Sequence, residues 1–188
     1  MEPVIADLVG PGMAVLFCGI NPGLRSAAAG LHFAGAGNRF WKVLAGAGFT
    51  DRVWAPEEQH RLSGMGIGIT NLVGRASASA AELSAAELRA GGEVLATKVA
   101  GWRPAHVAFV GMQAYRKAFR RPRASIGRQD LTLTGAGVWV LPNPSGLQAR
   151  YQLGEMIVAF AELRAAAFGA GTGTESGIPT NSRRSLRR

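Results

Sequence analysis

The stretch Ala14-Val-Leu-Phe-Cys18, followed directly by Gly19-Ile-Asn-Pro-Gly23, decides the fold class of this chain. Five consecutive apolar residues predict a strand that is buried on both faces, and the Gly/Pro-containing segment predicts a loop after it. Three further segments have the same buried-strand character, namely residues 66–70, 106–110 and 138–141. Strands that are buried on both faces are typical of parallel sheets covered by helices.

Helical patterns separate these strands. Ser84-Ala-Ala-Glu87 is a capping box for a helix that runs towards Ala100, with Gly91-Gly92 as a weak point inside it. Asn38 is a candidate cap, and the remaining helices are predicted near residues 40–44, 56–60, 111–119 and 151–168. Residues 131–134 alternate like an edge or hairpin strand. We therefore predict one α/β domain over residues 1–168, with three layers and a mostly parallel central sheet flanked by helices.

The composition limits the classes of function. Of the 188 residues, 47% are hydrophobic, which suffices for a packed core, and the net charge is +9. Residues 169–188 carry four arginines and one glutamate, and we expect them to form a basic, disordered tail. The remaining +6 favours a polyanionic partner such as nucleic acid. The single cysteine, Cys18, excludes a disulfide within the chain and a four-cysteine zinc site, and we expect its thiol to be inert.

The sequence predicts a soluble protein. No segment approaches the roughly 18 apolar residues of a membrane span. The N-terminus carries Glu2 and Asp7 without a basic cluster, which does not fit a signal peptide. We expect a cytoplasmic protein that does not associate with membranes.

Several catalytic chemistries lack candidate residues. The three histidines, at positions 32, 60 and 106, are far apart in sequence and show no metal-ligand spacing. There is no G-x-S-x-G motif and no phosphate-binding P-loop in the sequence. The three lysines lie on predicted helices, which disfavours a Schiff-base mechanism. We expect no metal and no organic cofactor.

Two polar loops remain as candidates. Residues 19–25 and 142–150 both leave the carboxyl ends of core strands, so the topology predicts that they lie on one rim of the sheet. Asn21 and Asn143 supply side-chain amides there, although a structural Asx turn is an alternative for Asn21. The second loop, Pro142-Asn-Pro-Ser-Gly-Leu147, is stiffened by two prolines and followed by Arg150. An exposed Leu147 on such a loop could act as a wedge between stacked bases.

A basic run offers a further surface. Six Arg and Lys residues lie between positions 116 and 128, without an acidic residue among residues 116–128. They could contact phosphates or form a solvated helix face, and the sequence leaves both alternatives open.

Four blocks together resemble a known family. They are Phe17-Cys-Gly-Ile-Asn-Pro-Gly-Leu24, Phe33 with Asn38-Arg-Phe-Trp41, Gly68-Ile-Thr-Asn-Leu-Val73 and Leu141-Pro-Asn-Pro-Ser-Gly-Leu147. In order and spacing they resemble the mismatch-specific uracil-DNA glycosylases, a branch of the uracil-DNA glycosylase superfamily related to thymine-DNA glycosylases. The similarity covers residues 10–165. It implies a uracil-DNA glycosylase-like fold and, as partner, double-stranded DNA with G·U or related mismatches.

The resemblance also implies roles for individual residues. Asn21 would position the water that attacks the sugar C1′, Asn143 would lie near the base, and Leu147 would fill the gap in the duplex. Implied substrate-binding residues are Ile20, Gly23, Ser26, Phe33, which stacks on the base, and Asn71. Implied DNA-binding residues are Ser145, Gly146, Leu147, Gln148 and Arg150. Gly146 and Gln148 would use backbone groups to contact the widowed guanine.

The expected reaction is removal of uracil by a monomeric, monofunctional glycosylase. An asparagine at position 21 can orient water but cannot take its proton, which predicts a slow enzyme unless a carboxylate such as Glu93 or Asp51 assists. Strictly uracil-specific relatives place a Tyr where this chain has Gly23, so bulkier 5-substituted and etheno pyrimidines should also fit. Ala149 stands where the family often has an Arg, which leaves the preference for the opposite base open. The alternatives are a non-catalytic mismatch or nucleic-acid binding protein on the same fold, and an α/β hydrolase acting on small molecules.

Overall fold

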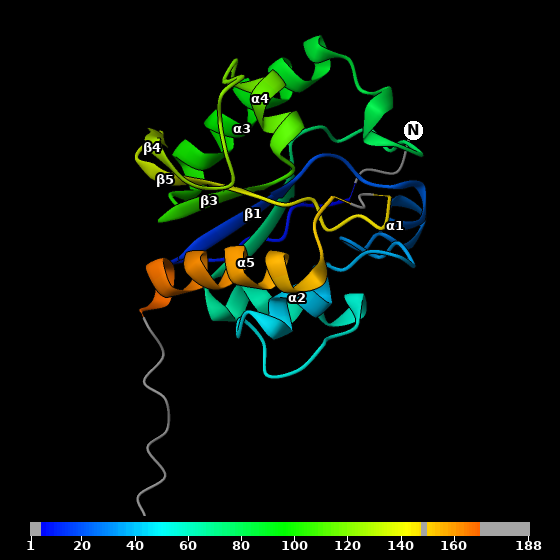
Figure 1. Ribbon diagram of the computed structural model, residues 1–188, viewed down its shortest axis with the longest axis vertical. Helices are drawn as coiled ribbons and strands as arrows, with labels where there is room; N and C mark the ends of the chain where they lie inside the picture. The colour runs from blue at the N-terminus through cyan, green and yellow to red at the C-terminus, as the bar shows by residue number, and fades with distance from the viewer. Residues whose placement is uncertain (1–4, 148–149, 170–188) are drawn as a thin grey trace, which may run out of the picture.

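One five-stranded sheet organises the part of the chain that the computed structural model describes, residues 5–147 and 150–169. The strand order is β2-β1-β3-β5-β4 (Figure 1). All neighbours pair in parallel except β4, which forms an antiparallel hairpin with β5 at the edge. The strands are β1 (Val15–Gly19), β2 (Ile67–Asn71), β3 (His106–Val110), β4 (Gly127–Leu133) and β5 (Ala136–Leu141). The mostly parallel sheet is thus confirmed.

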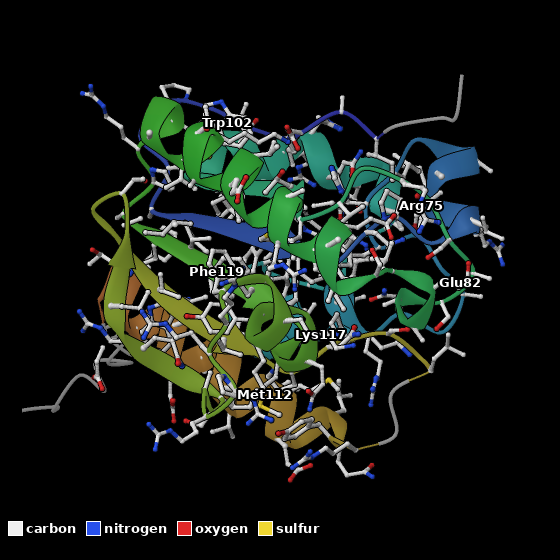
Figure 2. All side chains as sticks on the ribbon, turned by 90° about the horizontal axis from the view of Figure 1, so that it is seen from above. Arg75, Glu82, Trp102, Met112, Lys117 and Phe119 are labelled. Atoms are coloured by element: carbon white, nitrogen blue, oxygen red, sulfur yellow. The ribbon has the colours of Figure 1, made fainter. Side chains whose placement is uncertain are left out.

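Helices cover both faces of the sheet, which confirms the three-layer arrangement. Figure 1 shows α2 and α5 on one face and α3 and α4 on the other. Figure 2 looks down on the second face, where α3 and α4 cross the strands. The α-helices are α1 (Leu24–Ala29), α2 (Phe40–Gly46), α3 (Ala85–Trp102), α4 (Met112–Ala118) and α5 (Leu153–Phe168), with 3₁₀ segments η1 (Pro56–Met65) and η2 (Ala80–Glu82).

The position of β1 between β2 and β3, inside the sheet, explains why its sequence is apolar throughout. Val15 and Phe17 are fully buried in the core shared with α2 and α5, whereas Leu16 and Cys18 pack into the core on the α3 and α4 side. A strand between two helical layers has no solvent-facing positions, so polar alternation is absent. Burial raises the pKa of the Cys18 thiol far above its usual value. The thiol therefore stays protonated, as expected of an inert core cysteine.

Local structure departs from the sequence prediction in three places. Residues 24–29 form α1, whereas the predicted loop extends to residue 25 and no helix is predicted here. The helix has no side-chain cap and no acid in its first turn, so these local signals are missing from the sequence. The last helix begins at Leu153 rather than at Tyr151, with Gln152 as its N-cap. Strand β4 begins at Gly127, four residues earlier than predicted, and contains a register shift.

Gly91 is not a weak point of α3. A Cβ atom at this position would overlap the carbonyl oxygen of Leu72, the residue that follows β2. The glycine therefore lets the helix pack directly against the backbone at the end of β2. This contact fixes the position of the segment that leads out of the sheet towards the carboxyl rim.

Two further expectations concern membrane association and the C-terminal tail. No helix in residues 5–147 and 150–169 is long and apolar enough to cross a membrane. The predicted tail lies almost entirely outside the described residues, because residues 170–188 are not among them.

Candidate active site

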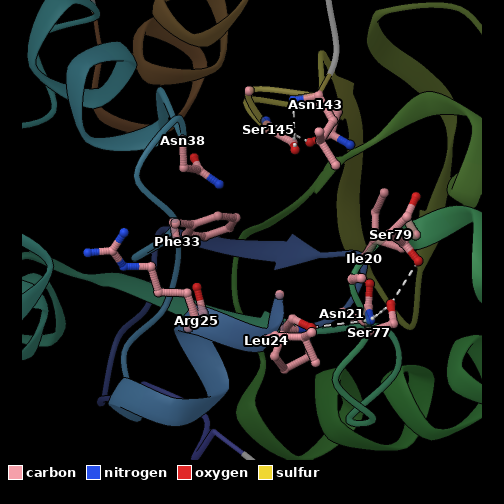
Figure 3. A pocket seen from close by; sticks show the side chains of 18 of the residues that line it. Ile20, Asn21, Leu24, Arg25, Phe33, Asn38, Ser77, Ser79, Asn143 and Ser145 are labelled. Atoms are coloured by element: carbon pink, nitrogen blue, oxygen red, sulfur yellow. Dashed lines mark hydrogen bonds between the residues drawn. The ribbon is translucent and has the colours of Figure 1, made fainter.

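A cavity of about 550 Å³ lies at the carboxyl rim of the sheet (Figure 3). The loops that follow β1, β2 and β5 line it together with the segment between α1 and α2. The two loops predicted to share one rim therefore do meet. A cavity of this volume lies within the range that accommodates small organic molecules.

Most of the predicted site residues line this cavity. They are Ile20, Asn21, Gly23, Ser26, Phe33, Asn71, Asn143, Ser145, Gly146 and Leu147. Arg150 instead lines a neighbouring cavity of about 350 Å³, and its guanidinium carbon lies 5.6 Å from the centre of the Tyr151 ring. Gln148 lies outside the described residues.

The two candidate carboxylates do not reach the cavity. Asp51 is exposed and accepts a hydrogen bond from Trp54 Nε1 at 2.8 Å, which lowers the pKa of its carboxyl. Glu93 is exposed on α3. The cavity lining within the described residues contains no Asp or Glu. A reaction in this cavity would therefore have to proceed without a carboxylate from the described residues.

The side chain of Asn21 has a defined amide orientation. Its Nδ2 donates to the carbonyl oxygen of Arg75 at 2.9 Å and to Ser77 Oγ at 2.8 Å. The Ser77 hydroxyl donates its own hydrogen to the carbonyl oxygen of Ser79, so it can only accept from Asn21. A weaker contact runs from Nδ2 to the carbonyl oxygen of Pro22 at 3.3 Å. All three partners of the Asn21 amide nitrogen are acceptors, which assigns the nitrogen to this side and leaves Oδ1 as an acceptor for a ligand or water. Figure 3 shows the hydrogen bonds that run from Asn21 to Ser77 and from Ser77 to Ser79.

The segment whose acceptors hold the Asn21 side chain, residues 75–79, does not belong to any of the sequence motifs described above. Arg75 Nε donates to Glu87 Oε1 at 2.9 Å, and Glu87 also accepts from the backbone N–H of Ser84 in the capping box of α3. Figure 2 shows Arg75 close to Glu82 at this end of α3. The orientation of Asn21 is thus tied to the start of a core helix. The Ser/Ala-rich sequence of residues 76–81 gives no local signal for such a role.

Asn143 shows the opposite amide orientation. Its Oδ1 accepts from the backbone N–H of Ser145 at 3.0 Å, which is an Asx turn. The Nδ2 group therefore remains as a donor at the cavity. Asn21 thus keeps an amide oxygen and Asn143 an amide nitrogen for further hydrogen bonds, and both residues line the cavity.

The ring of Phe33 is held in place by stacking on a second aromatic ring. Its ring stacks on Phe40, with centroids 3.9 Å apart and an angle of 20° between the planes. Phe40 is fully buried and contacts Phe17 edge-on at 5.4 Å, so this stack continues into the core. Phe33 also has a φ of +54°, which is uncommon for a bulky residue and points to a functional constraint. The buried hydroxyl of Ser26 accepts from the Ala34 N–H at 3.0 Å and holds this segment.

Asn71 is oriented by a buried histidine. His32 is 2% exposed, and its Nε2 lies 3.0 Å from the carbonyl oxygen of Ala6, so Nε2 carries the hydrogen. Its Nδ1 then accepts from Asn71 Nδ2 at 3.5 Å. Burial lowers the pKa of His32, which favours this neutral form. The spacing of the histidines in the sequence bears only on metal binding and gives no sign of this arrangement.

The rim of the cavity carries exposed apolar residues and open space. Leu147 is 74% exposed on the second loop, and Leu24 is 58% exposed at the start of α1. A Cβ atom at Gly23 would meet no other atom within 4 Å, and the φ of −69° at this position suits any residue. The rim therefore can contact a large apolar partner, and the cavity has unfilled volume beside Gly23.

The basic run from 116 to 128 is used partly for folding. Arg116 donates through Nε and Nη2 to the carbonyl oxygen of Ala124, which closes the loop after α4. Lys117 lines the neighbouring cavity. At least one arginine of the run therefore has a structural role.

The arrangement has the chemical groups needed to orient water and to recognise a flat polar ring. It contains an amide acceptor, amide donors and an aromatic face, and no hydroxyl or thiol paired with a base among the described lining residues. Such a set can orient water and stabilise a leaving group by hydrogen bonding.

Comparison with known proteins agrees with this arrangement. The family model "Uracil DNA glycosylase superfamily" matches residues 6–164. A solution NMR structure from Methanosarcina acetivorans, provisionally described as a uracil DNA glycosylase, superposes with a TM-score of 0.59 at 17% identity. The match covers 87% of this chain and 98% of that one, and at this identity it shows the shared fold. Since the family model spans most of the sequence, the chain belongs to the uracil DNA glycosylase superfamily.

Proposed function

We propose that this protein is a monofunctional DNA glycosylase that removes uracil mispaired with guanine from double-stranded DNA and leaves an abasic site. The observation that carries the proposal is the pair of oppositely oriented amides, Asn21 and Asn143, in one cavity beside the ring of Phe33. We further propose that it acts as a monomer in the cytoplasm, without a metal or organic cofactor.

The chemistry follows from the two amides. Cleavage of an N-glycosidic bond produces an oxocarbenium-like sugar and an anionic base. The Asn21 Oδ1 atom accepts a hydrogen bond from water and orients it towards the sugar carbon. The Nδ2 group of Asn143 donates to the departing base, where negative charge develops, and such donors supply the largest share of stabilisation. The water oxygen bonds to the sugar carbon as the bond to the base breaks, and the water proton passes to the departing base or to solvent. Without a carboxylate to take this proton, the reaction is slow.

Access to the base requires that it leave the helix stack. Phe33 then offers a rigid surface for stacking, and the exposed Leu147 occupies the space vacated in the duplex. A mispaired base leaves the stack at lower cost than a paired one, which favours G·U sites. The open space at Gly23 accommodates a substituent on C5, so larger pyrimidines are also substrates.

The test is a product analysis with the full chain in the presence of EDTA. Duplexes that contain uracil, thymine or ethenocytosine opposite guanine or adenine are incubated with stoichiometric protein. We expect free uracil and an abasic site from the G·U duplex, and less product from the A·U duplex. A gel shift without release of base would instead support the non-catalytic binding protein, and it would refute the proposal.

A further inference from the structure

Arg39 connects the segment between α1 and α2 to the second loop of the cavity, residues 142–150. It lies directly before α2, and its Nη1 donates to the carbonyl oxygen of Tyr151 at 2.9 Å. Its Nη2 donates to the carbonyl oxygen of Ser145 at 3.3 Å, and its backbone N–H donates to the carbonyl oxygen of Pro144 at 2.9 Å. One residue of the segment between α1 and α2 thus donates to two carbonyl groups of the second loop and to the carbonyl group of Tyr151, which follows that loop.

The same two segments also touch through their backbones. A Cβ atom at Gly146 would lie 2.8 Å from the carbonyl oxygen of Gly37 and 3.0 Å from its Cα. No side chain fits between these glycines, so the loop that carries Leu147 packs directly on the segment that carries Phe33. Figure 3 shows Phe33 and Asn38 on one side of the cavity and Asn143 and Ser145 on the other.

We infer that Arg39 is a positioning residue that fixes the loop bearing Leu147 relative to the segment bearing Phe33. This inference rests on the proposed function. The ring that receives the base and the leucine that fills its place then form one rigid unit, so extrusion of the base and insertion of the wedge occur together. Arg39 contributes through the loop and needs no contact with the DNA.

The guanidinium group suits this role because of its shape. Its two terminal nitrogens reach the carbonyl oxygens of Ser145 and Tyr151, which lie on opposite sides of residues 146–150 in the sequence. A planar fork can donate to both at once, whereas a lysine ammonium has a single donor atom. Hydrogen bonds from a charged donor are also stronger than neutral ones, which strengthens the attachment of Ser145 and Tyr151 to Arg39.

The experiment compares excision of uracil from a G·U duplex and from a single strand under single-turnover conditions. The wedge matters only in the duplex, so the duplex-to-single-strand rate ratio reports on it. We expect Arg39→Ala to lower this ratio about tenfold or more, since it removes two charge-assisted hydrogen bonds. Lys42→Ala removes an exposed cation from the adjoining helix α2 and should leave the ratio unchanged.

Two further variants distinguish a positioning role of Arg39 from an effect of its charge alone, and thermal melting excludes loss of folding. Arg39→Lys keeps the charge but loses the fork, and we expect a ratio between those of the wild type and Arg39→Ala. In the double variant Arg39→Ala/Leu147→Ala the ratio should equal that of Leu147→Ala alone, because both changes prevent the same insertion of Leu147 into the duplex. Thermal melting of each variant confirms that it is folded.

The outcomes are distinct for the two proposals. If the wild type releases no uracil from either substrate, the proposed function fails, and the inference fails with it. If the wild type is active but Arg39→Ala keeps the wild-type ratio, only the inference is wrong. A wild-type ratio in Arg39→Lys would also refute the inference. So would a double variant in which the losses caused by the two single changes multiply.

Discussion

Two adjacent glycines in α3 have opposite surroundings, which makes them a matched pair for mutation. A Cβ atom at Gly91 would overlap the carbonyl oxygen of Leu72 and lie 2.9 Å from its carbonyl carbon. At Gly92 the nearest atoms are in the ring of Phe119 at 3.5 Å, which is ordinary van der Waals contact. Both residues are buried inside the helix, so alanine changes the intrinsic helix preference equally at the two positions.

The expected magnitudes follow from these distances. Replacing glycine by alanine inside a helix stabilises it by about 0.5–1 kcal/mol, and Gly92→Ala should show this gain. At Gly91 the overlap adds a cost of about 1–3 kcal/mol, the usual range for overpacking. Leu72 cannot move away easily, because its N–H donates to the Gly19 carbonyl at 2.8 Å. Gly91→Ala should therefore be about 1–2 kcal/mol less stable than the wild type.

The assay is urea unfolding of the three proteins, followed by circular dichroism. We expect the midpoint to rise for Gly92→Ala and to fall for Gly91→Ala, with equal slopes. Leu72 follows Asn71, so Gly91→Ala should also reduce uracil release, whereas Gly92→Ala should not. A gain of stability in both variants would show that α3 does not press on the end of β2, and the explanation of Gly91 would be refuted.

Three other perturbations test separate features of the molecule. Gly23→Tyr should fill the open space beside Gly23, so that release of thymine and ethenocytosine falls much more than release of uracil; equal losses would show that this space does not receive the C5 substituent. Burial lowers the pKa of His32, so below about pH 6.5 the unfolded state binds more protons than the folded state. The free energy of unfolding should therefore decrease as the pH falls from about 6.5 to about 5, and His32→Asn should show a shallower decrease in the same urea assay. An identical pH dependence of the two proteins would contradict the lowered pKa of His32. Deleting residues 169–188 should weaken binding to all duplexes alike and reduce the log–log salt slope by about 0.9 for each phosphate that the tail neutralises. An unchanged slope in fluorescence anisotropy titrations would exclude the tail from DNA binding.

The sheet was predictable because its signal is local. Strands such as β1 and β3 are continuous apolar runs, and their boundaries agree with the sequence to within about one residue. Helix α1 was not predictable in this way, because it has neither a side-chain cap nor acidic residues in its first turn. Its stability comes from tertiary packing of Ser26 and Ala27, which a local pattern does not contain.

The candidate site was predictable only in part. The sequence predicted that Asn21 and Asn143 lie at the same rim, because the carboxyl ends of parallel strands lie at the same edge of a sheet. The partners that orient the amides of the cavity come from distant segments: Ser77 lies 56 residues after Asn21, and His32 lies 39 residues before Asn71. Neither partner belongs to a motif, so the sequence shows which amides line the cavity but not which atoms face it.

The central claim is that Asn21 orients the attacking water, and one measurement tests it most directly. Single-turnover release of uracil from a G·U duplex is compared for the wild type and Asn21→Ala, with duplex binding measured in parallel. We predict release by the wild type, a loss of about 10²- to 10⁴-fold in the variant, and nearly unchanged binding. Release at the same rate by Asn21→Ala would contradict the claim, because the water would then be held elsewhere.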